Sequence, residues 1–335
     1  MTAKINGAGV TINQSKVRMQ YRQSRQVVTG LTVNKKVNIR ADYYRLARAM
    51  AQNLFATGAY FIEDEEVKSL DRLEGILNHV HYVRDKSDQR SASEKKKAMT
   101  ATRRLYRDFL FFKNFVALGL PLIVCEGKTD NIYLRAAIRN LGVHTGVLRG
   151  MDGKLLVRFL NHESKSAEIL QLEGGTGALK FLFRDYKRNL TEFSFAPLEH
   201  PVIVLIDNDS GASQIFGIIE EKFQKKIELA TTELFYHVGD NLYLVKTPEL
   251  NGGKSSIEHL FDESLLKTKL GDKVFNHKEK IDTENEFGKA VFAEKIVVPN
   301  ASSINFAKFT PLLDRLAAVI VDYHSVKAKD PIGIA

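Results

Sequence analysis

The chain is poor in the features that define several protein classes. Its 335 residues include a single cysteine, which excludes an intramolecular disulfide framework and a thiolate zinc cluster. No apolar run approaches the roughly 20 residues of a membrane span, and the first residues lack the apolar core of a signal peptide. We therefore expect a cytoplasmic protein with no membrane partner.

Positive charge is concentrated in the first third of the chain. Residues 1–120 contain 22 Lys and Arg against 11 Asp and Glu, whereas residues 121–335 contain 27 against 29. Residues 1–62 carry ten basic side chains and one acidic side chain, that of Asp42. Such an excess is typical of a surface that binds the phosphate backbone of a nucleic acid. A basic surface that is merely solvated is the alternative.

The periodicity of apolar residues changes near residue 120. Before it, the pattern predicts two strands and three amphipathic helices, at 17–22, 26–34, 43–55, 70–80 and 105–116. After it, strands alternate with helices, and the strands are predicted at 120–125, 146–149, 201–206 and 241–246. The helices are predicted at 130–141, 178–189, 212–226, 256–267, 286–294 and 311–323. This alternation predicts an α/β fold with a mostly parallel, covered sheet.

Two short apolar runs end in acidic residues. The run 120–124 is soon followed by Glu126, and the run 202–206 is followed by Asp207 and Asp209. Because ligands of open α/β sheets bind outside the carboxyl ends of the strands, we expect these three carboxylates to converge. Carboxylates at close range repel one another unless a cation lies among them, and Mg²⁺ prefers oxygen ligands. The motifs therefore predict a metal-dependent phosphoryl-transfer site, with helix caps and surface acids as the alternative.

These two motifs also resemble a known family. Glu126-Gly127-Lys128-Thr129-Asp130 with Asp207-Asn208-Asp209 resembles the TOPRIM domain of topoisomerases, bacterial primases and overcoming-lysogenization-defect nucleases. The resemblance implies that Asp207 and Asp209 hold Mg²⁺ or Mn²⁺, and that Glu126 joins them or acts as general acid/base. Gly211 follows one position earlier than in the topoisomerase pattern, which weakens that branch of the family.

Further roles are carried over from the same resemblance. The segment 255–261 is similar to the late acidic motif of those nucleases, which implies Glu258 as a ligand of a second metal or an orienter of the first. Lys289 stands where they tend to carry a lysine that faces the scissile phosphate, which implies a catalytic role. Lys128 is expected to contact a phosphate, and Asp130 to start the following helix. Ordinary helix-surface or solvated side chains are the alternatives for Glu258, Lys289 and Lys128.

The basic segment carries a second resemblance. The stretch Gln26-Val27-Val28-Thr29-Gly30-Leu31-Thr32-Val33-Asn34-Lys35-Lys36-Val37-Asn38-Ile39 and the helix after it are similar to retron and group-II-intron-like reverse transcriptases. In that family the palm ends here and the helical thumb begins, and residues 73–80 are similar to the next thumb helix. The whole chain thus resembles retron reverse transcriptases with a C-terminal TOPRIM domain. The fingers, most of the palm and any Asp-Asp pair are absent, so we expect no polymerase activity from this chain alone.

A thumb implies contacts with the phosphates of a nucleic acid that carry no sequence information. The expected contact residues are Arg22, Arg25, Lys35, Lys36 and Arg40. The implied ligands are the retron RNA and its RNA-linked DNA, although each of these side chains would also be stable in solvent alone.

These inferences combine into one prediction. The fold is α/β: a Rossmann-like TOPRIM domain with a mostly parallel sheet, preceded by a strand pair and a small helical thumb module. Residues 1–40 are the end of a palm, 41–117 the thumb and 118–335 the nuclease domain. The resemblance further implies that the nuclease acts as a toxin-like effector of anti-phage defence, which bound retron RNA–DNA holds inactive and which cuts RNA such as tRNA, or DNA.

Several alternatives stay open. The chain could be a standalone TOPRIM nuclease or a primase-like enzyme, although a primase usually has a zinc ribbon and no cysteine cluster exists here. It could also be a non-catalytic module that binds nucleic acid. Further possible partners are a polymerase half that joins in trans and a second copy of the chain. Whether the chain is a truncation or a split gene product is also open.

Overall fold

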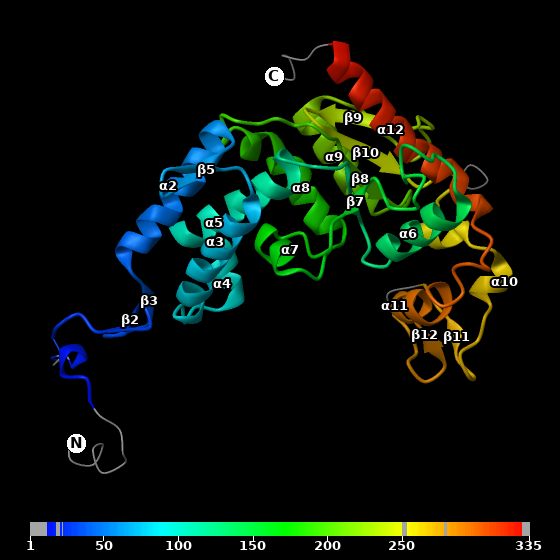
Figure 1. Ribbon diagram of the computed structural model, residues 1–335. Helices are drawn as coiled ribbons and strands as arrows, with labels where there is room; N and C mark the ends of the chain where they lie inside the picture. Colours follow the sequence, from blue (N-terminus) through cyan, green and yellow to red (C-terminus); the bar gives the residue numbers. More distant parts are fainter. Residues whose placement is uncertain (1–11, 18–20, 22, 250–252, 278–279, 330–335) are drawn as a thin grey trace. The chain divides into compact units, whose positions relative to one another are not determined.

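The computed structural model describes residues 12–17, 21, 23–249, 253–277 and 280–329. The chain divides into two compact units (Figure 1): unit 1 comprises residues 1–54 and 59–106, and unit 2 comprises residues 55–58 and 107–335. The finer predicted division at residues 40 and 117 stays a prediction, because compactness alone does not separate a palm remnant from a thumb. None of the helices in the described ranges combines the length and apolar content that a membrane span requires.

Within the described residues, unit 1 is built from short strands, one 3-10 helix and four α-helices. Its elements in chain order, with α2 and α5 continuing into unit 2, are η1 (Gln14–Lys16), β1 (Val27–Val28), β2 (Leu31–Thr32), β3 (Asn38–Ile39), α2 (Ala41–Thr57), β4 (Tyr60–Ile62), β5 (Glu65–Val67), α3 (Leu70–Lys86), α4 (Ala92–Lys97) and α5 (Ala101–Phe111). The strands form an antiparallel sheet of order β1-β2-β3 and a separate hairpin, β4-β5.

The stretch predicted as one strand at 26–34 is a hairpin. Thr29 and Gly30 have φ values of 45° and 84°, and a two-residue loop with positive φ at both positions matches the twist of an antiparallel pair. Gly30 therefore forms the turn between β1 and β2. Most of the strand predicted at 17–22 lies outside the described residues.

The helices predicted at 43–55 and 70–80 are confirmed as α2 and α3. Their buried residues recur at three- and four-residue steps, as in Leu73, Leu77 and Val80 of α3, so one face of each helix packs into the core. The polar run after α3 includes the short helix α4. The Ser91 hydroxyl and the Glu94 carboxylate each bond the other's backbone N–H there, which satisfies two donors at the helix start.

Unit 2 alternates strands with helices. Its elements are η2 (Phe112–Val116), β6 (Leu122–Cys125), α6 (Asp130–Leu141), β7 (Arg158–Phe159), α7 (Lys165–Leu170), α8 (Thr176–Leu190), β8 (Val202–Ile206), α9 (Ala212–Phe223), β9 (Tyr236–Gly239), β10 (Leu242–Lys246), η3 (Ile257–Leu260), α10 (Glu263–Leu266), β11 (Val274–Phe275), β12 (Glu286–Phe287), α11 (Lys289–Val291), η4 (Phe292–Val297), η5 (Ala307–Phe309) and α12 (Thr310–Lys329).

The central sheet is mostly parallel, as predicted. Its order is β7-β6-β8-β10-β9, and only the β10-β9 pair is antiparallel. Every residue of β6, β8 and β10 is buried, which is typical of a parallel sheet covered on both faces. One face packs against α6 and α12, which share a core with Ile123, Ile203 and Tyr243. Helices α8 and α9 pack against each other and contribute nothing to that core, so they cover the opposite face.

Three predicted elements are wrong. Residues 146–149 form turns with an isolated bridge, and the edge strand is β7 instead. The helix predicted at 256–267 is two short helices, η3 and α10, because the backbone of Phe261 is extended and its ring packs among aromatic side chains. A helix was predicted at 286–294, but its first two residues form the strand β12. The helical part begins with α11 at Lys289 and continues through η4 to Val297.

Candidate functional site

The strand order positions the first two acidic residues. From β6 the chain moves outward to β7 and then returns to place β8 on the other side of β6, so the order reverses between β6 and β8. Cys125 pairs with Leu205 in this register, and Glu126 and Asp207 follow these two strands at the same edge. A crevice at such a reversal is the usual ligand site of an open α/β sheet.

The Glu126 carboxylate is held by two donors. The hydroxyl of Thr176 donates to Oε1 at 2.6 Å, and the backbone N–H of Asp207 donates to Oε2 at 3.3 Å. The main chain of Glu126 is also fixed, because its carbonyl accepts the N–H of Gly175 at 2.9 Å. Gly174 and Gly175 have φ values of 101° and 84°, which favour glycine. The glycine-rich turn at the start of α8 therefore orients Glu126.

The Asp207 carboxylate lies in a strongly negative environment. Its Oδ1 accepts the backbone N–H of Ile257 at 3.0 Å. Burial, reinforced by the negative charges of Asp130, Glu258 and Glu126, raises the pKa of this carboxyl to about 8. A carboxyl with this pKa is mostly protonated at neutral pH, and a cation bound beside it would displace the proton.

Asp130 belongs to the same group of carboxylates. It is the first residue of α6, as predicted, and is 6% exposed. Its Oδ2 accepts the N–H of Gly127 at 2.7 Å, and a Cβ at position 127 would lie 2.7 Å from Oδ1. Burial, together with the nearby charge of Glu258, raises the pKa of Asp130 to about 6. A side chain at position 127 would therefore displace the Asp130 carboxylate.

Glu258 and Lys289 meet at this site from distant parts of the chain. Glu258 lies in η3 and is 2% exposed, and its Oε1 is 2.9 Å from Lys289 Nζ. Neither oxygen of this carboxylate has a hydrogen bond of normal geometry within the described residues, so the contact is an ion pair. Burial lowers the pKa of Lys289, but the carboxylates of Glu258, Asp207 and Asp130 outweigh burial and raise it overall. Lys289 therefore stays charged and neutralises part of the site.

Two other predicted residues lie differently. The Oδ1 of Asp209 accepts the N–H of Gly211 at 2.7 Å, so this carboxylate closes the turn before α9 in the metal-free arrangement. Lys128 is exposed and forms an ion pair of 3.5 Å with Glu163. Neither side chain contacts Glu126 or Asp207 through a hydrogen bond or ion pair within the described residues.

The predicted nucleic-acid contacts of unit 1 are on its surface. Arg25, Lys35, Lys36 and Arg40 are exposed, and Arg40 pairs with Asp42. Arg22 lies outside the described residues. Their exposure makes these side chains accessible to a phosphate backbone.

The donor chemistry of the carboxylate group fits a hard cation. Asp207 lies near the carboxylates of Asp130, Glu258 and Glu126, and Lys289 pairs with Glu258. Oxygen donors of this kind suit Mg²⁺ or Mn²⁺. The negative charges of Asp130, Glu258 and Glu126 add to burial in raising the pKa of Asp207. Within the described part of the chain, no three His, Cys, Asp or Glu side chains already form a metal-binding cluster. Ion binding therefore requires these side chains to move closer together.

Two members of the site could not be assigned from sequence. The sequence motifs do not single out Thr176, and they indicate for Asp130 only the start of a helix. The available signal was their position at helix starts, where side chains return toward the preceding loop. Their contacts with Glu126 and Gly127 depend on the packing of α8 and α6 against the sheet.

No protein-family model matches the chain, and no solved structure matches it. The TOPRIM and retron resemblances therefore rest on the quoted sequence motifs.

The raised pKa of Asp207 predicts a pH-dependent stability. The folded protein binds a proton on Asp207 between about pH 4 and pH 8 that the unfolded chain does not bind, so metal-free stability falls as pH rises through this window. Asp207→Asn keeps the acceptor for Ile257 and removes the charge. The free energy of unfolding of the variant minus that of the parent should be about 1–3 kcal/mol larger at pH 8 than at pH 5. Urea unfolding in EDTA measures both proteins at both pH values. Glu163→Gln, at an exposed carboxylate, is the control, and identical pH profiles of parent and Asp207→Asn would contradict the assignment.

The Glu258–Lys289 ion pair predicts strong coupling between two substitutions. Lys289→Met leaves Glu258 buried without a counter-charge and should destabilise the protein by about 2 kcal/mol, less than for a fully buried pair because Lys289 is 37% exposed. Adding Glu258→Gln should recover most of the loss. Lys295→Met, at an exposed lysine of η4, should have little effect. Additive unfolding free energies for the two single variants would show that the pair is not coupled.

Proposed function

We propose that unit 2 is a metal-dependent nuclease of the TOPRIM type. The observation that carries the proposal is the convergence of Glu126 and Asp207 at the reversal of strand order, where the N–H of Asp207 bonds the Glu126 carboxylate. The quoted Glu126 and Asp207-Asn208-Asp209 motifs agree with that position. Phosphodiester hydrolysis is favoured because oxygen donors at such an edge suit a cation that binds phosphate.

The residues of the candidate site have specific roles in this proposal. Asp207 and Glu126 would hold Mg²⁺ or Mn²⁺, with Glu258 as a further ligand or an orienter and Asp209 as a ligand once it leaves its turn. A bound ion would neutralise charge on the phosphate and activate a water molecule. Thr176 fixes the orientation of Glu126, which can then accept a proton from the attacking water. Lys289 would contact the scissile phosphate when a cation replaces it beside Glu258.

The proposal for unit 1 is a nucleic-acid grip of the reverse-transcriptase thumb type. Its support is the exposed basic residues of the segment similar to that family, Arg25, Lys35, Lys36 and Arg40, with Arg22 as a further expected contact. The resemblance implies the retron RNA and its linked DNA as the ligands. A thumb would hold their phosphate backbone without reading the bases. In the same proposal the nuclease cuts RNA such as tRNA, or DNA, as an effector of anti-phage defence that works in the cytoplasm.

A second candidate function is a non-catalytic module that binds nucleic acid. It is favoured by the Glu258–Lys289 ion pair and by the bond between Asp209 and Gly211. Through these contacts a lysine and a backbone N–H compensate two of the acidic side chains without an ion. A module of this kind would keep the basic surface of unit 1 and cleave nothing.

Cleavage by the purified full chain tests the first proposal. Labelled tRNA, single-stranded RNA and DNA are incubated with Mg²⁺, with Mn²⁺ or with EDTA. Cleavage should require the metal and fall at least about 100-fold in Asp207→Ala and in Glu126→Gln, because each removes a group that acts on the reacting atoms. Glu163→Gln should cleave like the parent, and all four proteins should bind the substrate in EDTA.

The outcomes separate the two candidates. Cleavage that persists in Asp207→Ala and Glu126→Gln would overturn the assigned site. Tight, salt-dependent binding with no cleavage by the parent in either metal would favour the non-catalytic module.

A further inference from the structure

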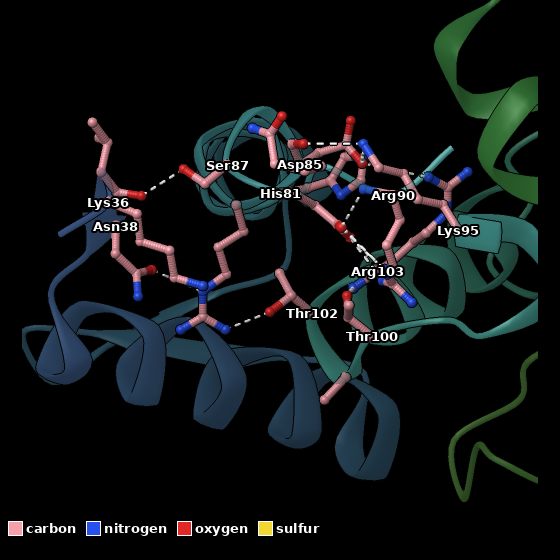
Figure 2. Close-up of a pocket in the computed structure, with 15 residues that line it drawn as sticks. Lys36, Asn38, His81, Asp85, Ser87, Arg90, Lys95, Thr100, Thr102 and Arg103 are labelled. Atoms are coloured by element: carbon pink, nitrogen blue, oxygen red, sulfur yellow. Dashed lines mark hydrogen bonds and ion pairs between the residues drawn. The ribbon is translucent and has the colours of Figure 1, made fainter. Parts of the chain in front are cut away.

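A cavity in unit 1 lies far along the chain from the carboxylates. It has a volume of about 520 Å³ and lies where β3, the end of α3, α4 and the start of α5 meet (Figure 2). Its lining is rich in charged and polar side chains, including Lys36, His81, Arg84, Arg90, Lys95 and Arg103. A volume of this size suits a small ligand or the end of a nucleic-acid strand, and it is too small for a nucleic-acid duplex.

Positive charge exceeds negative charge in this lining. Five Lys or Arg side chains line the cavity, against the carboxylates of Asp85 and Asp88. Asp88 is paired with Arg90 at 2.7 Å, whereas Asp85 is shared by Lys95 at 3.4 Å and Arg103 at 3.6 Å. The lining therefore has a net charge of about +3, which favours an anionic ligand.

Arg84 is fixed in place by neutral partners. Its Nε donates to the side chain of Asn38 at 3.3 Å, its Nη1 donates to the hydroxyl of Thr102, and its guanidinium stacks on the ring of Tyr44 at 4.0 Å. It forms no ion pair with a carboxylate among the described residues. A guanidinium held in this way is preorganised for an anion, since the contacts that fix it leave its charge uncompensated.

Arg103 supplies an independent observation. This residue is 7% exposed, and its Nε has no hydrogen-bond partner within the described residues. A buried donor without an acceptor is costly. Arg103 also belongs to the first turn of α5, whose N-terminus carries the positive end of the helix dipole. Figure 2 shows Arg103, Thr100 and Thr102 on the same side of the cavity.

We propose that this cavity binds a phosphate monoester, either that of a free mononucleotide or the 5′-terminal phosphate of a nucleic-acid strand. A doubly charged phosphate matches the net charge of the lining better than a carboxylate does. Its oxygens match the fork of an arginine, and the start of a helix is a common place for phosphate. The lining of this cavity shares no residue with the carboxylate group of unit 2, and phosphate binding there does not depend on cleavage.

Binding measurements in EDTA test the proposal on the full chain. The probes are adenosine 5′-monophosphate and one fluorescent oligonucleotide made with a 5′-phosphate or a 5′-hydroxyl. The parent should bind the phosphorylated oligonucleotide about tenfold more tightly. Lys95→Gln should abolish this preference, and Arg84→Lys, which keeps the charge but loses the fork, should reduce it.

The matched control is Lys97→Gln. Lys97 lies in the same helix α4 but is exposed and does not line the cavity, so its loss should leave the preference intact. Since α4 buries none of its residues, neither α4 variant should unfold the protein, and circular dichroism checks this.

Each outcome decides the question. If the mononucleotide binds and displaces the phosphorylated strand, the cavity takes a free nucleotide. If the mononucleotide does not bind but the 5′-phosphorylated oligonucleotide binds more tightly than the 5′-hydroxyl form, the cavity takes the end of a nucleic-acid strand. No preference and no mononucleotide binding by the parent would overturn the proposal, as would equal losses in Lys95→Gln and Lys97→Gln. Because these readouts need no metal, they are independent of the nuclease proposal.

Discussion

The candidate site of unit 2 depends on the parallel pairing of β6 with β8. This register brings Cys125 opposite Leu205 and so delivers Glu126 and Asp207 to one edge of the sheet. Both strands are fully buried, and burial of their apolar side chains stabilises an arrangement in which acidic groups come close together. The repulsion among these groups is partly relieved by Lys289 and by backbone N–H donors. The remaining negative charge is what makes the edge suitable for a cation.

Much of this arrangement could be predicted from sequence. The strands β6 and β8 are short apolar runs rich in β-branched residues. Such runs, when they alternate with helices along the chain, indicate a parallel sheet. Because carboxyl ends of parallel strands share an edge, the proximity of Glu126 and Asp207 followed directly. Helices α2, α3, α6 and α8 carry strong 3.6-residue patterns, so their existence was also predictable.

The remaining features depend on tertiary contacts that no local pattern encodes. Strand β7 has two residues and exists because the backbone of β6 pairs with it. The break between η3 and α10 follows from the packing of Phe261 among other rings. In the site, Asp209 was predicted beside Asp207 but bonds its own turn, while Asp130 and Thr176 join the site through the approach of two helices. The cavity of unit 1 combines residues from four segments, and charge counts along the chain do not reveal it.

The most direct test of the central claim is the location of a bound ion. Crystals grown with Mn²⁺ and measured near the manganese absorption edge would show the ion as an anomalous peak. We predict a peak within about 2–2.5 Å of carboxylate oxygens from both Glu126 and Asp207, the range expected for hard divalent cations, and no peak there in Asp207→Asn crystals. A well-ordered site that binds no ion at saturating Mn²⁺, or an ion held without Glu126 and Asp207, would contradict the account.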